Sequence, residues 1–125
     1  MVATQDTPFT TEPNPFLIHL IGVREWLEEK LDGPAHDLWF TPRGMDGKTA
    51  VKLELLAIDT MLEYIYAQMD AGRTVEEIRG LSKEFALQEC KKASLKAKDE
   101  DTSPIGQYTV LSNIYRRMCL TTTIL

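Results

Sequence analysis

The chain has 125 residues, of which 43% are hydrophobic and 26% charged, and its formal net charge is −5. This length and composition are typical of one globular domain, and they argue against a chain that is disordered throughout. No apolar run approaches the ~20 residues of a bilayer-spanning helix. Residues 1–13 lack the basic start and apolar run of a secretory signal. We therefore expect a cytoplasmic protein without membrane contact.

Residues 1–13 are polar and contain prolines, and we expect them to form a flexible arm. Asn14-Pro15 predicts a helix start, because Asn caps helices and Pro suits their first position. Gly33-Pro34 predicts the end of that helix near residue 31. Between them, apolar residues recur at three- and four-residue steps, which predicts one buried stripe. The stripe consists of Phe16, Leu20, Val23, Leu27 and Leu31.

Residues 32–48 form the longest irregular stretch, and we predict one long loop there. A short strand at 38–41 is an alternative, but a connector whose aromatic residues pack into the core fits the glycines and proline better. Trp39, Phe40 and Arg43 belong to the residue types that are enriched in binding hot spots. We therefore keep them as candidate partner-binding residues, with core packing as the alternative.

The clearest helical pattern covers residues 49–71. One apolar stripe runs along it, and a second apolar patch lies roughly opposite. A helix that is apolar on two faces is either central in its fold or exposes one face to a partner. The first stripe is Val51, Leu55, Ile58, Leu62, Ile65 and Met69, and the second patch is Leu53, Leu56, Ala57, Thr60 and Tyr64.

Thr74 and Glu77 have the spacing of a capping box, which predicts a helix start. Gly80-Leu81-Ser82 predicts a break in that helix, after which small residues recur at 86, 90, 93 and 97. Small residues allow a neighbouring helix to approach closely. A final helix is expected to start at Ser103-Pro104, and the β-prone residues 121–125 are expected to fray or to pack on the domain.

One basic segment lies in this acidic chain. A capped helix, a glycine and a second, lysine-rich helix within residues 74–98 are similar in pattern to a helix-turn-helix, whose lysines would contact phosphates. The turn is short for that motif, however, and no base-reading residues begin the second helix. A single kinked surface helix, or an acidic protein partner, are the other interpretations. The basic residues are Arg79, Lys83, Lys91, Lys92, Lys96 and Lys98.

We expect no catalytic, metal or cofactor site. Gly47-Lys48-Thr49 resembles the end of a phosphate-binding loop, but Pro42 stands where the first glycine of that loop is required. His19 and His36 are not spaced with other ligands for a metal shell. Asp59 and Glu63, one helical turn apart, fit a solvated charged face better than an acid–base pair. Cys90 and Cys119 form no CxxC motif and are interpreted as free thiols.

The sequence therefore predicts an all-α fold: an irregular bundle of about four main helices in one domain, residues 14–125. The first functional hypothesis is a non-enzymatic adaptor, inhibitor or assembly factor that binds another protein or a second copy of itself, without a cofactor. The alternative is a nucleic-acid-binding regulator that uses the basic segment, and a small enzyme is the third hypothesis. The predicted partner surface combines Trp39, Phe40, Arg43, Leu53, Leu56, Thr60 and Tyr64.

Overall fold

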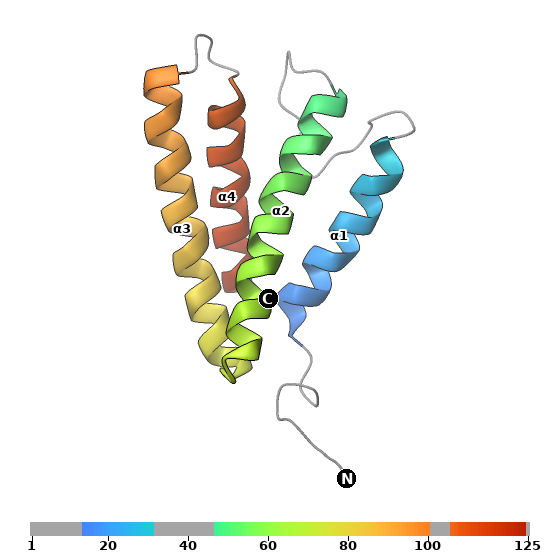
Figure 1. Ribbon diagram of the computed structural model, residues 1–125, viewed down its shortest axis with the longest axis vertical. Helices are drawn as coiled ribbons and strands as arrows, with labels where there is room; N and C mark the ends of the chain where they lie inside the picture. The colour runs from blue at the N-terminus through green and yellow to red at the C-terminus, as the bar shows by residue number, and fades with distance from the viewer. Residues whose placement is uncertain (1–13, 32–46, 101–105, 125) are drawn as a thin grey trace.

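The computed structural model describes residues 14–31, 47–100 and 106–124, and within these ranges the chain forms four α-helices and no strand. The prediction of an all-α bundle is thereby confirmed. Consecutive helices run in opposite directions (Figure 1). Within the same ranges, no helix has both the length and the apolar character needed to cross a membrane. The helices are α1 (Pro15–Leu31), α2 (Gly47–Asp70), α3 (Val75–Glu100) and α4 (Gln107–Ile124).

Several sequence-based expectations fall outside the described residues. These are the arm at 1–13, the possible strand at 38–41 and the helix start at Ser103-Pro104. The loop predicted at 32–48 is two residues too long, since α2 already begins at Gly47. Helix α4 is described from Gln107, and the carbonyl of Gly106, which precedes it, accepts the hydrogen bond from the Val110 N–H.

Local sequence signals explain where three of the helices start or stop. The Asn14 side chain accepts hydrogen bonds from the N–H groups of Phe16 and Leu17, at 3.1 and 3.2 Å, which confirms the predicted cap of α1. At the end of α2, Gly72 has a φ of 80°, and its N–H donates to the Met69 carbonyl. Only glycine adopts this conformation at low cost, and it ends the helix in a Schellman motif.

The capping box at the start of α3 is also confirmed. The backbone N–H of Thr74 donates to the Glu77 carboxylate at 2.9 Å, and the N–H of Glu77 donates to the Thr74 hydroxyl at 3.1 Å. These reciprocal bonds satisfy two backbone donors that the first turn of a helix leaves free. They also lower the pKa of Glu77, chiefly through the bond from the Thr74 backbone.

Residues 121–124 are helical despite their β propensity, and they pack on the bundle, which was one of the two expectations for the tail. Thr121 donates its hydroxyl hydrogen to the Arg117 carbonyl at 2.8 Å, and Thr122 donates to the Cys119 carbonyl at 2.7 Å. Threonine tolerates a helix when its hydroxyl bonds to the preceding turn in this way. Thr122 is also buried, so packing against the bundle stabilises the last turn of α4.

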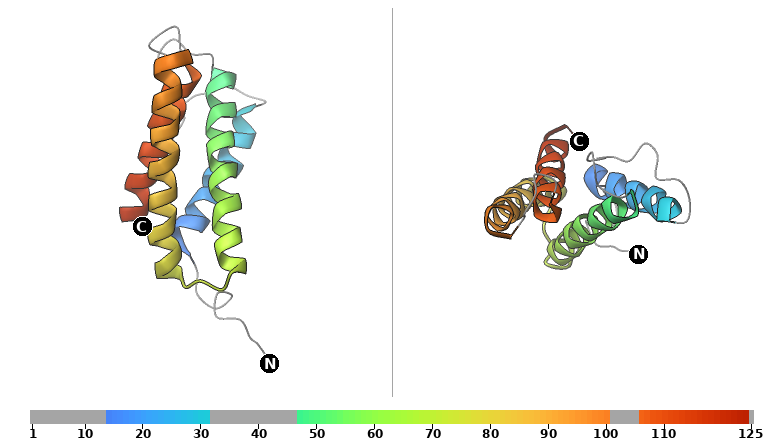
Figure 2. Two further views of the ribbon diagram at one scale, coloured as in Figure 1. Left: turned by 60° about the vertical axis from the view of Figure 1, so that its left-hand side comes forward. Right: turned by 90° about the horizontal axis from the view of Figure 1, so that it is seen from above.

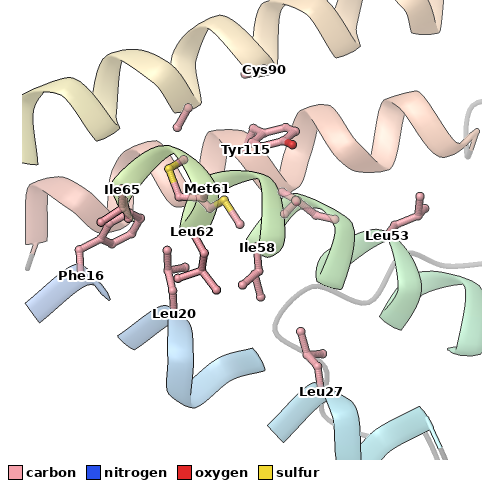
Figure 3. Packing of buried hydrophobic residues seen from close by; sticks show 14 of the residues in the cluster. Phe16, Leu20, Leu27, Leu53, Ile58, Met61, Leu62, Ile65, Cys90 and Tyr115 are labelled. Carbon is pink, nitrogen blue, oxygen red and sulfur yellow. The ribbon is translucent and has the colours of Figure 1, made fainter. Parts of the chain in front are cut away.

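Helix α2 is the central element of the fold, since it contacts α1, α3 and α4 (Figure 2). Phe16 and Leu20 of α1 point toward Ile65 and Leu62 of α2, while Tyr115 approaches α2 from α4 (Figure 3). One apolar face of α2 therefore packs against α1, and the other packs against α3 and α4, within one core. This is the first of the two interpretations that a doubly apolar helix allows.

An ion pair joins α1 to α2 at the edge of this core. The Arg24 guanidinium lies 2.6 Å from Asp59 and 2.6 Å from Glu28. Its hydrogen bond to Asp59, and then the charge of Asp59, raise the pKa of Arg24 above its ordinary value. Asp59 thus anchors a neighbouring helix.

Candidate functional site

The structure places part of the predicted partner surface inside the fold. Leu53 is buried at 8% exposure rather than exposed. Tyr64 is half-buried, and its ring stacks on that of Phe85 from α3 with the centroids 4.2 Å apart. These positions follow from the central place of α2, because its second face meets α3 and α4. Trp39, Phe40 and Arg43 lie outside the described residues.

Leu56 and Thr60 of the same predicted surface line a small groove of about 320 Å³, bounded by α2, α3 and α4. Leu56 is 54% exposed, and its carbonyl accepts a 2.9 Å hydrogen bond from the Thr60 hydroxyl. Tyr115 lines the groove from α4, and its burial raises the pKa of its phenol. The floor of this groove is therefore a continuation of the core.

The predicted break in the basic segment is wrong, because α3 is one continuous helix from Val75 to Glu100. Gly80 lies within it, and Ser82 faces the core with no exposure. The side chain of Ser82 is therefore turned inward and caps no second helix. Because the turn is missing, residues 74–98 do not form the two crossed helices of a helix-turn-helix.

The basic residues of α3 are distributed over different sides of the helix. Lys91 and Lys98 line a large groove between α3 and α4, whereas Lys92 and Lys96 line the small one. Lys92 also pairs with Glu89 at 2.7 Å, and the ammonium group of Lys96 lies over the ring of Tyr108. Arg79 lies 3.9 Å from Glu76, and Lys83 is exposed. These six residues therefore do not form one continuous basic face.

The large groove, with a volume of about 530 Å³, lies between α3 and α4. Leu95 of α3 and Leu120 of α4 flank it and are 63% and 61% exposed. Two large apolar side chains on adjacent helices that remain open to water mark a candidate interaction site. The residues that line the groove are Leu87, Cys90, Lys91, Ser94, Leu95, Lys98, Arg116, Cys119 and Leu120.

Close packing of α3 against α4 forms the floor of the large groove. Ala86 and Ala93, which belong to the predicted stripe of small residues on α3, are buried, and small side chains allow a neighbouring helix to approach closely. The hydroxyls of Ser94 and Ser112 lie 2.6 Å apart. Ser112 also donates to the Cys90 carbonyl at 3.4 Å. This polar contact fixes the register of the two helices beneath the groove.

The large groove is positively charged. Lys91 and Lys98 contribute from α3 and Arg116 from α4, and none of the three forms an ion pair with a described residue. None of the residues that line the groove is Asp, Glu or His. Apolar side chains with basic groups beside them suit an amphipathic, acidic ligand. This local charge contrasts with the net charge of −5 of the whole chain.

Two free thiols belong to the same groove: Cys90 is buried and Cys119 is half-buried. The groove offers no acid–base pair, because its lining holds no carboxylate and no imidazole. Within the described ranges, no three His, Cys, Asp or Glu side chains lie where they could hold a metal ion. Glu54 is fully buried, but it lies on α2 and lines neither groove.

The sequence interpretation missed Leu95 and Leu120 as site residues. Leu95 lies outside the stripe of small residues on α3, and Leu120 lies one turn before the end of α4. The signal that could have identified this surface is Leu95, a large apolar residue that lies outside the buried stripe of a lysine-rich helix. Pairing the two residues required knowledge of how α3 packs against α4.

No protein-family model, curated protein or solved structure matches this chain significantly.

Proposed function

We propose that this protein is a small, non-enzymatic protein-binding module, and that it binds a helical segment of its partner in the large groove between α3 and α4. The single observation that carries this proposal is the exposure of Leu95 and Leu120, at 63% and 61%, on the two walls of one groove. Leaving both side chains in water costs free energy that a bound partner would recover.

The shape of the groove favours a helix as the bound element. On α3 its lining extends over residues 87–98, which is about 16 Å along a helix axis. That length accommodates about three turns of a partner helix, which would bury its apolar face between α3 and α4. Basic residues beside the apolar ones would orient an acidic partner.

Nucleic-acid binding is the second candidate function, and the unpaired cations Lys91, Lys98 and Arg116 favour it. Two observations weigh against it. The helix-turn-helix geometry is missing, and Lys92 and Lys96 of α3 face a different groove. Affinity for nucleic acid would fall steeply with salt, and it would not depend on the exposed leucines.

Capture from a lysate of the source organism, with and without nuclease, tests the proposed function. Wild-type protein is compared with Leu95→Asp and Leu120→Asp, and Leu56→Asp is the matched control because Leu56 is similarly exposed but lines the small groove. We expect a protein partner that survives nuclease, is lost with both groove variants and is kept with the control. Partners that nuclease removes, or that all variants keep, would contradict the proposal. We also place the protein in the cytoplasm, where its two thiols would stay reduced.

A further inference from the structure

We infer that the large groove binds helix α1 of a second copy of this chain. This inference rests on the proposed function, since it assigns the partner of the same groove. It joins two surfaces that are separate within one copy: the groove, and an exposed face of α1 that we call the acidic face. The acidic face consists of Ile18, Ile21, Glu25 and Glu29.

The acidic face of α1 is open in the single chain. Ile18 and Ile21 are 58% and 37% exposed, although Phe16 and Leu20 beside them are buried against α2. Glu25 and Glu29 are exposed, and neither forms an ion pair with a described residue. At 100° per residue, the four side chains fall within about 80° of one another around the helix. They therefore form one continuous strip.

The two surfaces are complementary in charge. The acidic face carries two carboxylates and no cation, while the groove carries Lys91, Lys98 and Arg116 and no carboxylate. Each set of charges has no partner of opposite sign in its own copy among the described residues. An association between copies would satisfy both sets and cover exposed apolar side chains on both sides. Opposite charges of this kind orient an encounter and disfavour wrong partners.

The two surfaces also match in length, and each has a charged residue at one end, Glu29 on α1 and Lys98 in the groove. The acidic face spans residues 18–29 and the lining of the groove on α3 spans residues 87–98, each about 16 Å long. Leu120 follows Ser112 by about 12 Å along α4, and Ser112 contacts Ser94. Leu120 therefore lies toward the Leu87 end of the groove, with Lys98 at the other end.

This order sets the direction of the bound helix. If the isoleucines of α1 lie at the end with Leu87 and Leu120, its glutamates extend toward Lys91 and Lys98. Helix α1 of one copy would thus run parallel to α3 of the other. If each of two copies inserts its α1 into the groove of the other, the result is a two-fold symmetric dimer. If each copy inserts its α1 into the groove of a third copy instead, the result is a longer assembly.

Sedimentation of the purified full-length chain over a range of concentrations measures this association. We expect self-association that weakens as salt is added, because exposed charges of opposite sign contribute to it. Two charge-reversal variants test the assignment. Lys91→Glu with Lys98→Glu makes the groove acidic, and Glu25→Lys with Glu29→Lys makes the face of α1 basic.

Each variant alone would place like charges opposite one another in every contact, and we expect its dissociation constant to rise by about 100-fold. An equimolar mixture of the two variants would again pair opposite charges in both contacts. We therefore expect the mixture to associate to about the same extent as the wild type. No general effect of net charge or of weakened folding predicts this recovery.

The matched control for the groove variant is Lys52→Glu with Lys96→Glu, which lowers the net charge by the same amount outside the large groove. It should self-associate like the wild type. The helical circular dichroism signal and the urea midpoint of every variant establish that it is folded. Leu95→Asp provides a second, independent disruption, and it should abolish association.

The outcomes for the second copy and for protein binding in general are distinguishable. A dimer or a longer assembly that the mixture restores supports the inference. A wild type that stays monomeric, or association that is unchanged in either charge-reversal variant, overturns it. If such a monomer still captures a partner that depends on Leu95, only the second copy is excluded. A wild type that neither self-associates nor captures such a partner overturns the proposed function as well.

Discussion

The aromatic rings of Tyr64 and Phe85 stack with centroids 4.2 Å apart and an interplanar angle of 12°, and they join α2 to α3. Tyr64 belongs to the face of α2 that the sequence analysis predicted to bind a partner, yet its ring packs against Phe85 of the same chain. At this position, the second apolar face of α2 is therefore covered by α3.

The stack is expected to contribute a measurable coupling between the two helices. In a double-mutant cycle with Tyr64→Leu and Phe85→Leu, we expect a coupling free energy of about 1 kcal/mol, because stacked aromatic pairs stabilise beyond their burial. Urea unfolding measures it, and Tyr64→Phe is the control that should retain stability. Strictly additive losses would show that the rings do not interact in solution.

Ser82→Ala is expected to stabilise the protein by about 1 kcal/mol. The hydroxyl of Ser82 is fully buried and has no hydrogen-bond partner, and removing an unpaired buried polar group removes its desolvation cost. Ser112→Ala is the comparison, because the Ser112 hydroxyl is bonded to Ser94, and its loss should destabilise. Chemical denaturation of both variants decides the matter. A lower stability of Ser82→Ala would mean that its hydroxyl is bonded in solution.

The buried stripe of small residues on α3 leaves little room for larger side chains. Ala86 has no exposure, so Ala86→Leu should destabilise the chain by about 2 kcal/mol through overpacking. Ala67→Leu adds the same atoms at an exposed position of α2 and should leave the unfolding midpoint almost unchanged. If Ala86→Leu and Ala67→Leu change the midpoint of thermal unfolding equally, Ala86 is not closely packed in solution.

The capping box of α3 makes the free energy of unfolding depend on pH. The pKa of Glu77 in the folded chain lies below its ordinary value of 4.5, so the ionised carboxylate favours the folded state. This contribution is complete above the ordinary value and is lost as the pH falls through the lower, folded-state pKa. Glu77→Gln keeps a capping side chain without the charge.

The free energy of unfolding of Glu77→Gln, measured against pH, should therefore lie below that of the wild type at neutral pH. The two curves should converge in acid, below the pKa of Glu77. A difference that persists unchanged at the lowest pH would mean that the charge of Glu77 is not the cause.

Substitutions at Leu53 and Leu56 directly test which apolar residues of α2 are exposed to solvent. Leu53→Asp would bury a charge and should destabilise by more than about 3 kcal/mol. Leu56 is 54% exposed, so Leu56→Asp should change stability by less than about 0.5 kcal/mol. Urea titration of the two variants measures both effects. Similar losses would place Leu56 in the core as well.

Local signals predicted most of the fold. The cap at Asn14, the capping box at Thr74 and the apolar spacing of α1 and α2 each depend on residues within one or two turns. Such signals act within a single element, and a sequence displays them directly. The same local reasoning failed at Gly80, because packing on one side of α3 holds the helix together across a weak position.

The candidate site was less predictable, since it depends on how helices are placed relative to one another. Periodicity showed that α2 has two apolar faces, but not that other helices cover most of both faces while Leu56 stays exposed. It marked the lysines of α3 without separating Lys91 from Lys92, which point into different grooves. Leu120 became a site residue only because α4 runs antiparallel to α3. These are properties of tertiary packing.

The order of packing in this bundle has a consequence for the rate at which it forms. Helices α3 and α4 are consecutive in the chain and have the most extensive contact, whereas α1 contacts mainly α2. Contacts between neighbouring segments close at small entropic cost, so we expect a fast-folding chain in which the α3–α4 hairpin forms early. In native-state hydrogen exchange, the amide hydrogens of α1 should exchange fastest, because α1 should be the first helix to open. The pair of helices that forms the groove would then be the most persistent part of the molecule, and the helix proposed to fill it would be the most easily released.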